Sequence, residues 1–335
     1  MGGGSAMDGR RAGGVLLGLA GLLLTAACGA GSGGPAPQGS APAARAGAGA
    51  GAAPAPKAPT GPYVALGDSY TAGPAIDPQV GTPSGCGRSG ANYPSLVAKA
   101  LGLAAGPGFT DVSCSGATTA DLTGAQQTSD GTNAPQLDAL TPATRLVTLG
   151  IGGNDVGFVE VLTECAKENL AHSLFGGLTG TSGDQAPCRT HYTAAPGQDQ
   201  LRARIDTAGE KLTGLLREIA RRAPEARVYV VGYPALLPAD PAGCARTLGR
   251  TVAAGDLGFL LDEERGLDAM LEQRAEAAGA RYVDTFGPSA GHDMCAGQDT
   301  RWIEPPVPAA GAAPVHPNAL GQQGLAAAVL GAVRG

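Results

Sequence analysis

The amino-acid sequence predicts an α/β protein, a three-layer sandwich in which helices cover both faces of a central parallel sheet. Short apolar runs rich in valine and leucine recur along the chain, with helical patterns between them. Continuous rather than alternating apolar runs are typical of parallel strands buried on both faces. Strand and helix repeated in this way predict a doubly wound sheet. The predicted strands are Tyr63–Leu66, Phe109–Val112, Arg145–Leu149, Arg227–Val231 and Arg281–Val283.

Three helices follow from the spacing of apolar residues in the second half of the chain. Between Leu201 and Ile219, apolar residues recur at intervals of three and four on one stripe, as in an amphipathic helix. A second helix, Leu257–Leu271, has leucines and a methionine on one side and the acidic run Asp262–Glu264 on the other. The last helix runs from about Asn318 to Val333. Long loops, rich in Gly, Thr, Ser, Pro or Ala, are expected at 176–197 and 303–314.

Composition divides the chain into three segments. Residues 1–28 have the pattern of an export signal: Arg10-Arg11 supplies the positive end, and Val15–Leu24 is an apolar core too short to span a membrane. The paired arginines also fit twin-arginine export. Residues 29–60 are almost entirely Ala, Gly, Pro and Ser, so we expect a disordered tether. Residues 61–335 are long enough for one substantial core, and we expect one monomeric domain.

Cys28 ends the export signal, in the run Leu24-Thr25-Ala26-Ala27-Cys28. This run resembles the lipobox of bacterial lipoproteins, although Thr25 stands where that motif has Leu, Val or Ile. We expect a lipid on Cys28 to anchor the mature chain to the outer face of the cytoplasmic membrane. Plain cleavage, which would release a secreted protein, is the alternative.

The remaining cysteines predict disulfide bonds. Of the seven cysteines, six remain once Cys28 is set aside, and an even number in an exported chain predicts three disulfides. Six cysteines allow fifteen connectivities. We favour sequential pairing, because each bond then closes one local loop. The pairs would be Cys86–Cys114, Cys165–Cys188 and Cys244–Cys295.

Neither a metal nor a nucleic acid is indicated. No two of the six cysteines have the short spacing of a zinc knuckle, and the four histidines are scattered. The net charge is −6, with acidic and basic residues interspersed, so the basic footprint of a nucleic-acid-binding protein is missing from the sequence.

Four separated motifs fit one reaction if they meet at the carboxyl ends of the strands, where α/β sheets bind ligands. They are Gly67-Asp68-Ser69-Tyr70, Ser115-Gly116, Gly152-Gly153-Asn154-Asp155 and Val315-His316-Pro317-Asn318. The first presents a serine hydroxyl at the end of a buried strand. A serine nucleophile needs a base, and the imidazole of histidine has a suitable pKa without perturbation. We therefore pair Ser69 with His316.

Acyl transfer also requires fixed donors for the charge that develops on the carbonyl oxygen. We expect these donors to be the backbone amides of Ser69 and Gly116 and the side-chain amide of Asn154. Glycine at 116 allows close approach of the backbone, and Gly152 and Gly153 allow a tight turn before Asn154. The ordinary alternatives are a helix-capping role for Ser69 and a turn role for Asn154.

In this order and at these separations, the motifs resemble the four blocks of the GDSL or SGNH hydrolase family. More closely, Tyr63–Gly73, Trp302-Ile303-Glu304-Pro305 and Val315–Asn318, with six cysteines between, are similar to the secreted actinobacterial (Streptomyces-type) lipases and esterases of that family. The resemblance covers the chain from Tyr63 onward. It implies a flavodoxin-like α/β/α fold, hydrolysis of a lipid or small ester, no cofactor and three sequential disulfides.

One position departs from the family pattern. The family usually has an aspartate three residues before the histidine, where this chain has Ala313. Some secreted actinobacterial members orient the imidazole with a backbone carbonyl of the same segment, which implies that Ala313 or Pro314 supplies one here. We therefore predict a Ser–His dyad, with Asp284 as a distant alternative.

Other functions remain open at this point. A phospholipase or a carbohydrate deacetylase would use the same machinery, and a lipoprotein with a degenerate site would only bind a ligand. The Gly-x-Ser-x-Gly elbow of ordinary α/β-hydrolases is disfavoured, because Thr71 stands in place of the second glycine. Trp302 either lines an acyl pocket or packs in the core. The remaining histidines, His172, His191 and His292, receive no role.

Overall fold

The computed structural model describes residues 61–104, 106–179, 186–194, 199–246, 252–307 and 311–335, together with Pro59 and Leu248. The predicted export signal, the lipobox with Cys28 and almost all of the predicted tether lie outside the described residues. Among the described helices, none has both the length and the apolarity that a membrane span requires.

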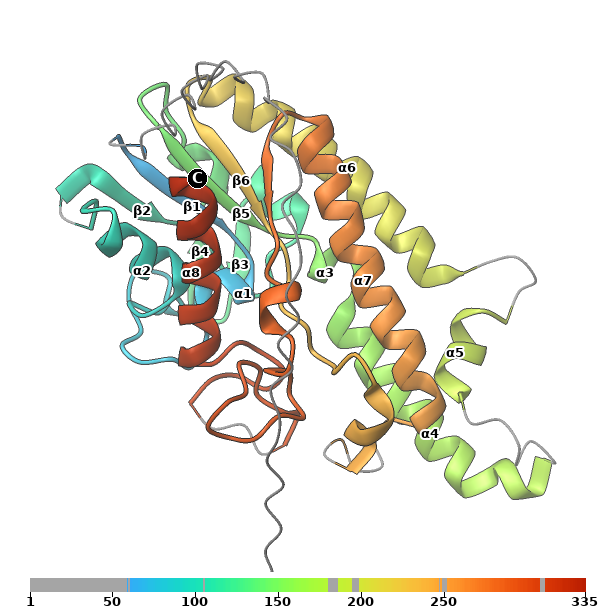
Figure 1. Ribbon diagram of the computed structural model, residues 1–335. Helices are drawn as coiled ribbons and strands as arrows, with labels where there is room; N and C mark the ends of the chain where they lie inside the picture. The colour runs from blue at the N-terminus through green and yellow to red at the C-terminus, as the bar shows by residue number, and fades with distance from the viewer. Residues whose placement is uncertain are drawn as a thin grey trace, which may run out of the picture. The chain divides into compact units, whose positions relative to one another are not determined.

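The centre of the fold is a five-stranded parallel sheet in the order β2-β1-β5-β6-β7 (Figure 1). All five strands coincide with the predicted apolar runs to within one residue at each end. Every residue of β1 and β5 is buried, as expected for strands covered on both faces. A small antiparallel hairpin, which the sequence analysis did not predict, lies outside this sheet. The strands are β1 (Tyr63–Gly67), β2 (Phe109–Asp111), β3 (Gln126–Thr128), β4 (Gly131–Asn133), β5 (Leu146–Gly150), β6 (Arg227–Val231) and β7 (Arg281–Val283).

Alternate residues of the strands point to opposite faces, and each face has its own helices. On one face, Tyr63 and Ala65 pack with α2 (Tyr93–Ala100) and α8 (Ala319–Arg334). On the other, Val64 and Leu66 belong to a cluster with α6 (Gln200–Arg222) and α7 (Ala254–Ala277). Figure 1 shows α2 beside α8 on one side of the sheet and α6 beside α7 on the other. The three-layer α/β/α prediction is confirmed.

The predicted helices are present, but one predicted face was wrong. Along α7, Asp262 is exposed as expected, whereas Glu264 is buried beside Leu260 and Leu267. The reason is helical geometry: residues three and four apart share a face, so Glu264 lies on the same stripe as those leucines. Three consecutive acidic residues cannot all point the same way from a helix.

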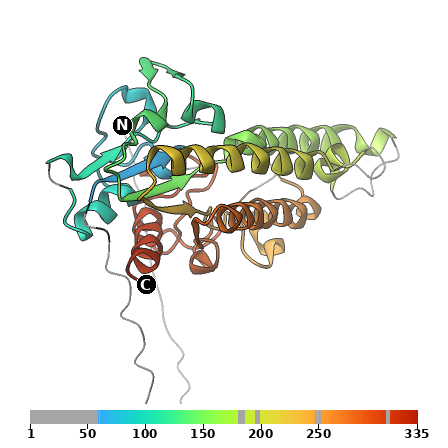
Figure 2. The ribbon, with the colours of Figure 1, turned by 90° about the horizontal axis from the view of Figure 1, so that it is seen from above.

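A second apolar cluster lies beyond the sheet, where α4 (Phe158–Thr179) and α5 (Pro187–Tyr192) pack near the start of α7. Figure 2 shows α4 and the ends of α6 and α7 extending past the sheet. Two parts of the predicted 176–197 loop are therefore helical, which corrects that prediction. The short α5 depends on tertiary contacts, since the Asp256 carboxylate accepts hydrogen bonds from the backbone of Cys188 and Arg189.

Three disulfides join segments around the sheet, with the sequential connectivity. Cys86 bonds Cys114 near β2, Cys165 of α4 bonds Cys188 of α5, and Cys244 bonds Cys295. By restricting the unfolded chain, each bond is expected to stabilise the fold by about 2–4 kcal/mol. The 3₁₀ helices in the described part of the chain are η1 (Ser84–Cys86), η2 (Gly106–Gly108), η3 (Thr119–Leu122), η4 (Gln136–Ala139), η5 (Pro241–Arg246) and η6 (Gly287–Ser289).

Candidate active site

Ser69 lies at the junction between β1 and the single-turn helix α1 (Ser69–Ala72). Asp68 caps this helix, because its Oδ1 accepts the N–H of Tyr70 at 2.9 Å. Ser69 is the first helical residue, so its own N–H has no intrahelical acceptor. The turn needs glycine at 67, where φ is 153° and a Cβ would come within 2.5 Å of the Gly150 carbonyl oxygen. The sharp turn thus presents both the hydroxyl and the amide of Ser69 at the strand end.

His316 lies next to Ser69, although 247 positions separate them in the chain. Its Nε2 is 2.8 Å from Ser69 Oγ, and its Nδ1 is 2.7 Å from the carbonyl oxygen of Pro314. Burial lowers the pKa of His316 from 6.5, and the hydrogen bond to Pro314 acts in the opposite direction. The neutral imidazole that a general base requires is therefore favoured near neutral pH.

The carbonyl at Nδ1 belongs to Pro314, one of the two predicted residues. The carbonyl of Ala313, the other predicted residue, instead accepts the backbone N–H of His316 at 3.2 Å. The distant alternative, Asp284, is exposed, and its Oδ1 accepts the N–H of Gly287 at 2.9 Å. Among the described residues, the Nδ1 partner is thus a backbone oxygen rather than a carboxylate.

The histidine segment has an unusual backbone at Val315, where φ is 61°. A β-branched residue rarely adopts this conformation, and such strain persists only where surrounding contacts enforce it. Here Val315 N–H donates to the Glu304 carbonyl at 3.0 Å, and the hydroxyl of Tyr70 donates to the Val315 carbonyl at 2.6 Å. Tyr70 follows Ser69 in the chain, so its side chain ties the serine turn directly to the histidine segment.

Asn154 and Gly116 lie on the loops that follow β5 and β2. Asn154 is in the single-turn helix α3 (Gly153–Val156) and lines the same pocket as Ser69 and His316. Its Nδ2 donates to the Ala117 carbonyl at 2.9 Å, which leaves its second hydrogen for another acceptor. Gly116 has φ 77°, and no acceptor for its amide is found among the described residues. Gly116 does not itself line that pocket.

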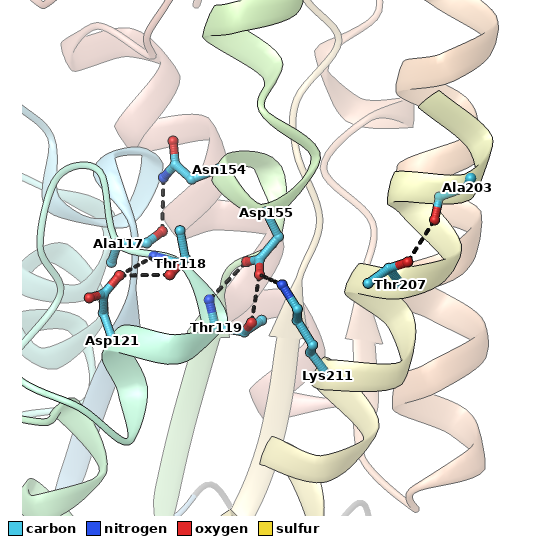
Figure 3. Close-up of polar contacts among 9 residues, drawn as sticks. All are labelled: Ala117, Thr118, Thr119, Asp121, Asn154, Asp155, Ala203, Thr207 and Lys211. Carbon is cyan, nitrogen blue, oxygen red and sulfur yellow. Dashed lines mark hydrogen bonds and ion pairs between the residues drawn. The ribbon is translucent and has the colours of Figure 1, made fainter. Parts of the chain in front are cut away.

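Asp155 joins these two loops, as Figure 3 shows. Its carboxylate accepts the backbone N–H of Thr119 at 2.8 Å and the Thr119 hydroxyl at 2.6 Å, and Lys211 of α6 pairs with it at 3.1 Å. Thr118 and Asp121 form a capping box in the same loop. Asp155, the last residue of the Gly152–Asp155 motif, therefore positions the loop of Gly116 relative to Asn154. This role was not predicted from the sequence.

Tyr233 is a site residue that sequence reasoning missed. Its hydroxyl donates to Asp68 Oδ2 at 2.5 Å and accepts the N–H of Gly153 at 2.9 Å, so it connects the first and third motifs. Burial raises the pKa of Asp68 to about 7. Tyr233 comes two residues after β6 ends. A polar side chain just past a strand end is the sequence signal that would have identified it.

An apolar cavity of about 360 Å³ adjoins the reaction pocket. Both are lined by Phe158, Val159, Leu162, Leu236, Glu264 and Val315. Trp302 lines neither, and its ring stacks on His292 with centroids 4.8 Å apart, so the packing alternative holds for it.

One cluster elsewhere has the spacing of metal ligands. Glu164, Glu168 and His191 offer ligand atoms within 4.8 Å of one another on α4 and α5. Glu164 already pairs with Lys167 at 2.9 Å and Glu168 with His191 at 3.1 Å. These contacts account for the cluster, and no polar residue of the reaction pocket belongs to it.

Known proteins are similar to this chain over most of its length. A family model described as the GDSL-like lipase/acylhydrolase family matches residues 65–323. Lipase 2 of Streptomyces coelicolor is 41% identical over 271 residues, which cover 80% of this chain and 84% of that protein. Two crystal structures share the fold with TM-scores of 0.61. Phospholipase A1 from Streptomyces albidoflavus NA297 is 28% identical, covering 81% of this chain and 98% of that one. An extracellular lipase from Streptomyces rimosus is 27% identical, covering 81% and 99%.

The chain therefore belongs to the GDSL-like lipase/acylhydrolase family. It is a carboxylic-ester hydrolase with the α/β fold of that family. The names of the similar proteins differ in substrate, whereas hydrolysis of an ester is common to them.

Proposed function

We propose that this ester hydrolase is an extracytoplasmic esterase or lipase that works through a Ser69–His316 dyad. The 2.8 Å distance between Ser69 Oγ and His316 Nε2 is the observation that supports the dyad most directly. The carbonyl of Pro314 at Nδ1 supports it further, since that contact keeps a hydrogen on Nδ1 and leaves Nε2 free as the base.

In this mechanism, Ser69 Oγ attacks the ester carbonyl while His316 Nε2 takes the hydroxyl proton. The imidazolium then gives that proton to the leaving alcohol, and an acyl-enzyme remains. Water attacks the acyl-enzyme with His316 again as the base, which releases the acid and restores Ser69. The Pro314 carbonyl holds the ring tautomer and accepts from the imidazolium at Nδ1, without the full negative charge of an aspartate.

Charge on the carbonyl oxygen is held by three donors in this proposal: the amides of Ser69 and Gly116 and the Nδ2 of Asn154. The hydrogen bond from Asn154 to Ala117 supports a fixed orientation of that side-chain amide, and Asp155 fixes the adjoining loop. Preorganised donors need no rearrangement as charge develops, which is the main source of their catalytic effect.

The acyl chain of the substrate is proposed to occupy the apolar cavity. The lining of the cavity includes Leu237, Val252, Leu260 and Met294. Six further residues line both the cavity and the reaction pocket. Each methylene moved from water to such a lining contributes about 0.8 kcal/mol. An ester with an alkyl chain should therefore react better than an acetyl ester, which favours an esterase or lipase over a carbohydrate deacetylase.

A phospholipase is the second candidate, because the phospholipase A1 of Streptomyces albidoflavus has this fold at 28% identity. Its substrate would present the same acyl ester to Ser69 with a charged headgroup on the alcohol side. Rates on a triglyceride, a diacyl phosphatidylcholine and acetylated xylose, measured with one enzyme preparation, distinguish the three substrate classes.

Export is proposed on separate grounds. Three disulfides are typical of an oxidising compartment outside the cytoplasm, and the similar Streptomyces rimosus lipase is extracellular. We propose that the enzyme is secreted or held at the cell surface through a lipid on Cys28, as the lipobox predicts.

The test of the dyad is Ser69→Ala in the full chain. Turnover of p-nitrophenyl butyrate should fall to background, while the thermal unfolding midpoint stays near that of the wild type. A fluorophosphonate probe should label Ser69 in the wild type, as identified by peptide mass spectrometry. The matched control is Ser95→Ala in α2, which removes a hydroxyl outside the pocket and should retain activity. Turnover that survives in the Ser69 variant, with the control unchanged, would refute the proposal.

A further inference from the structure

The motif Trp302-Ile303-Glu304-Pro305 lies alongside the histidine segment, although none of its residues lines the reaction pocket or the apolar cavity. The Glu304 N–H donates to the His316 carbonyl at 3.0 Å, and the Glu304 carbonyl accepts from Val315 N–H at 3.0 Å. The backbone of this motif is thus bonded both to the proposed base and to the residue before it, whose φ is 61°.

The side chain of Glu304 makes a second connection to the histidine segment. Its Oε2 is 2.7 Å from Arg301 Nη2, and its Oε1 accepts from Asn318 Nδ2 at 2.9 Å. The Glu304 side chain is 3% exposed and that of Arg301 is 13% exposed, so this ion pair is screened little by solvent. Asn318 comes two residues after His316 and caps α8. The carboxylate therefore joins the motif to the cap of the helix that follows the proposed base.

The amide of Asn318 is held in one orientation by its partners. Its Nδ2 also donates to the Arg301 carbonyl at 3.0 Å, and its Oδ1 accepts from two backbone amides at the start of α8. A buried ion pair adds little net stability compared with apolar packing, because both charges lose their hydration. Moving Glu304 away from Arg301, however, would leave a buried charge without a counter-ion, which is strongly unfavourable.

We propose that Glu304 is the positioning residue for His316. The Nδ1 partner of His316 is the backbone carbonyl of Pro314, so the orientation of the ring follows the backbone of the segment that contains it. The Glu304 backbone holds this segment at Val315 and His316, and the Glu304 carboxylate holds it beyond His316 through Asn318. This inference rests on the proposed function, since it takes His316 as the base.

The first experiment replaces the ion pair in the full chain by the double substitution Arg301→Met and Glu304→Met. Two apolar side chains leave no buried charge alone, so the thermal midpoint should stay near that of the wild type. We nevertheless expect kcat for p-nitrophenyl butyrate to fall by about tenfold at nearly constant KM, because the base is displaced while the substrate pocket is intact. Glu304→Gln alone leaves Arg301 without a counter-ion and should lower both kcat and the thermal midpoint.

The second experiment observes the imidazole ring by proton NMR in protein with isotope-labelled histidine. The Nδ1–H of His316, bound to the Pro314 carbonyl, should give a downfield resonance, which is assigned by its loss in His316→Gln. In the double variant this resonance should move upfield or broaden through exchange with water. A side chain that only stabilises the fold would not change this signal in a folded variant.

Asp111 provides a matched control, because it supports another helix-capping asparagine. Its Oδ2 accepts from Asn92 Nδ2 at 2.7 Å, and Asn92 caps α2, which packs beside α8. Asp111→Asn keeps one oxygen for its bonds to Ser113 but replaces the acceptor of Asn92 with an amide donor. This variant should lose thermal stability while kcat and the His316 resonance stay at their wild-type values.

The outcomes separate this inference from the proposed function. A wild-type kcat in the folded double variant would overturn the positioning role, as would an unchanged His316 resonance. An equal loss of kcat in Asp111→Asn would also overturn it, since any loosened helix cap would then have the same effect. The same readouts on Glu304→Gln decide the question if the double variant does not fold.

Failure of the proposed function has a different signature. If the wild type hydrolyses no ester and no fluorophosphonate label appears on Ser69, the proposed function itself fails. The His316 resonance still tests the positioning of the ring in that case, because it does not depend on turnover.

Discussion

The two halves of the proposed dyad are held in different ways. Ser69 lies in a continuous strand–turn–helix segment, where its support comes from neighbours in sequence such as Asp68 and Gly67. His316 lies in an irregular segment that depends on distant partners, with Glu304 and Tyr70 both bound to Val315. The conformation of the serine turn is thus local in origin, with added support from Tyr233 through Asp68, whereas the conformation of the histidine segment depends mainly on tertiary contacts.

This difference suggests that the histidine side is the part of the site more sensitive to remote substitutions. The strained φ of Val315 persists only while its partners hold the segment. The partner of His316 Nδ1 is the backbone carbonyl of Pro314 rather than a carboxylate. The orientation of the imidazole ring therefore depends on the backbone conformation of the segment that contains His316.

The largest expected effect comes from His316→Gln, which removes the base. We expect kcat for p-nitrophenyl butyrate to fall by roughly 10⁶-fold, as when histidine is lost from a catalytic triad. The control is His292→Gln, whose ring stacks on Trp302 and should not alter kcat strongly. Comparable losses in both variants would mean that packing, rather than proton transfer, explains the effect.

Asn154→Ala is expected to have the next largest effect. Removal of one oxyanion donor lowers kcat by about 10²–10³-fold, with little change in KM. Because Asn154 also binds the Ala117 carbonyl, the thermal midpoint should be measured in parallel. A kcat near that of the wild type in a folded variant would remove Asn154 from the oxyanion hole.

Tyr70→Phe tests the hydrogen bond that connects the serine turn to the histidine segment. Loss of the 2.6 Å hydrogen bond to Val315 should loosen the histidine segment and lower kcat by about tenfold at nearly constant KM. Tyr63→Phe is the matched control, because it removes a buried tyrosine hydrogen bond to Thr148 at 2.8 Å in the core of the sheet. We expect this control to lose stability without a comparable loss of kcat. If the two variants lose kcat equally, Tyr70 has no particular positioning role.

The smallest expected effect is a displaced pH profile. Since burial lowers the pKa of His316, its base form should persist to a lower pH than that of a free imidazole. The acid limb of kcat/KM should therefore have its midpoint below pH 6.5, with activity falling as the pH drops through it. A midpoint above 6.5 would contradict the buried, carbonyl-bound imidazole.

Much of the fold was predictable because the patterns behind it are local. Continuous apolar runs marked all five strands of the sheet, and apolar spacing marked α6, α7 and α8. The predicted exposure of Glu264 was wrong, because all three residues of the acidic run Asp262–Glu264 were assigned to one side of the helix. The short α5 was missed because its support comes from Asp256 and from the bond between Cys165 and Cys188 rather than from its own pattern.

The sequence by itself determined which residues offer chemistry: the serine after a buried strand, the glycine-flanked asparagine and the histidine near the C-terminus. Only the tertiary structure decided which carbonyl meets His316, that Tyr233 bridges Asp68 and Gly153, and that Glu264 lines the reaction pocket. The physical reason is range. Strand and turn patterns depend on neighbouring residues, whereas these contacts join segments that are distant in sequence and meet only when the sheet has formed.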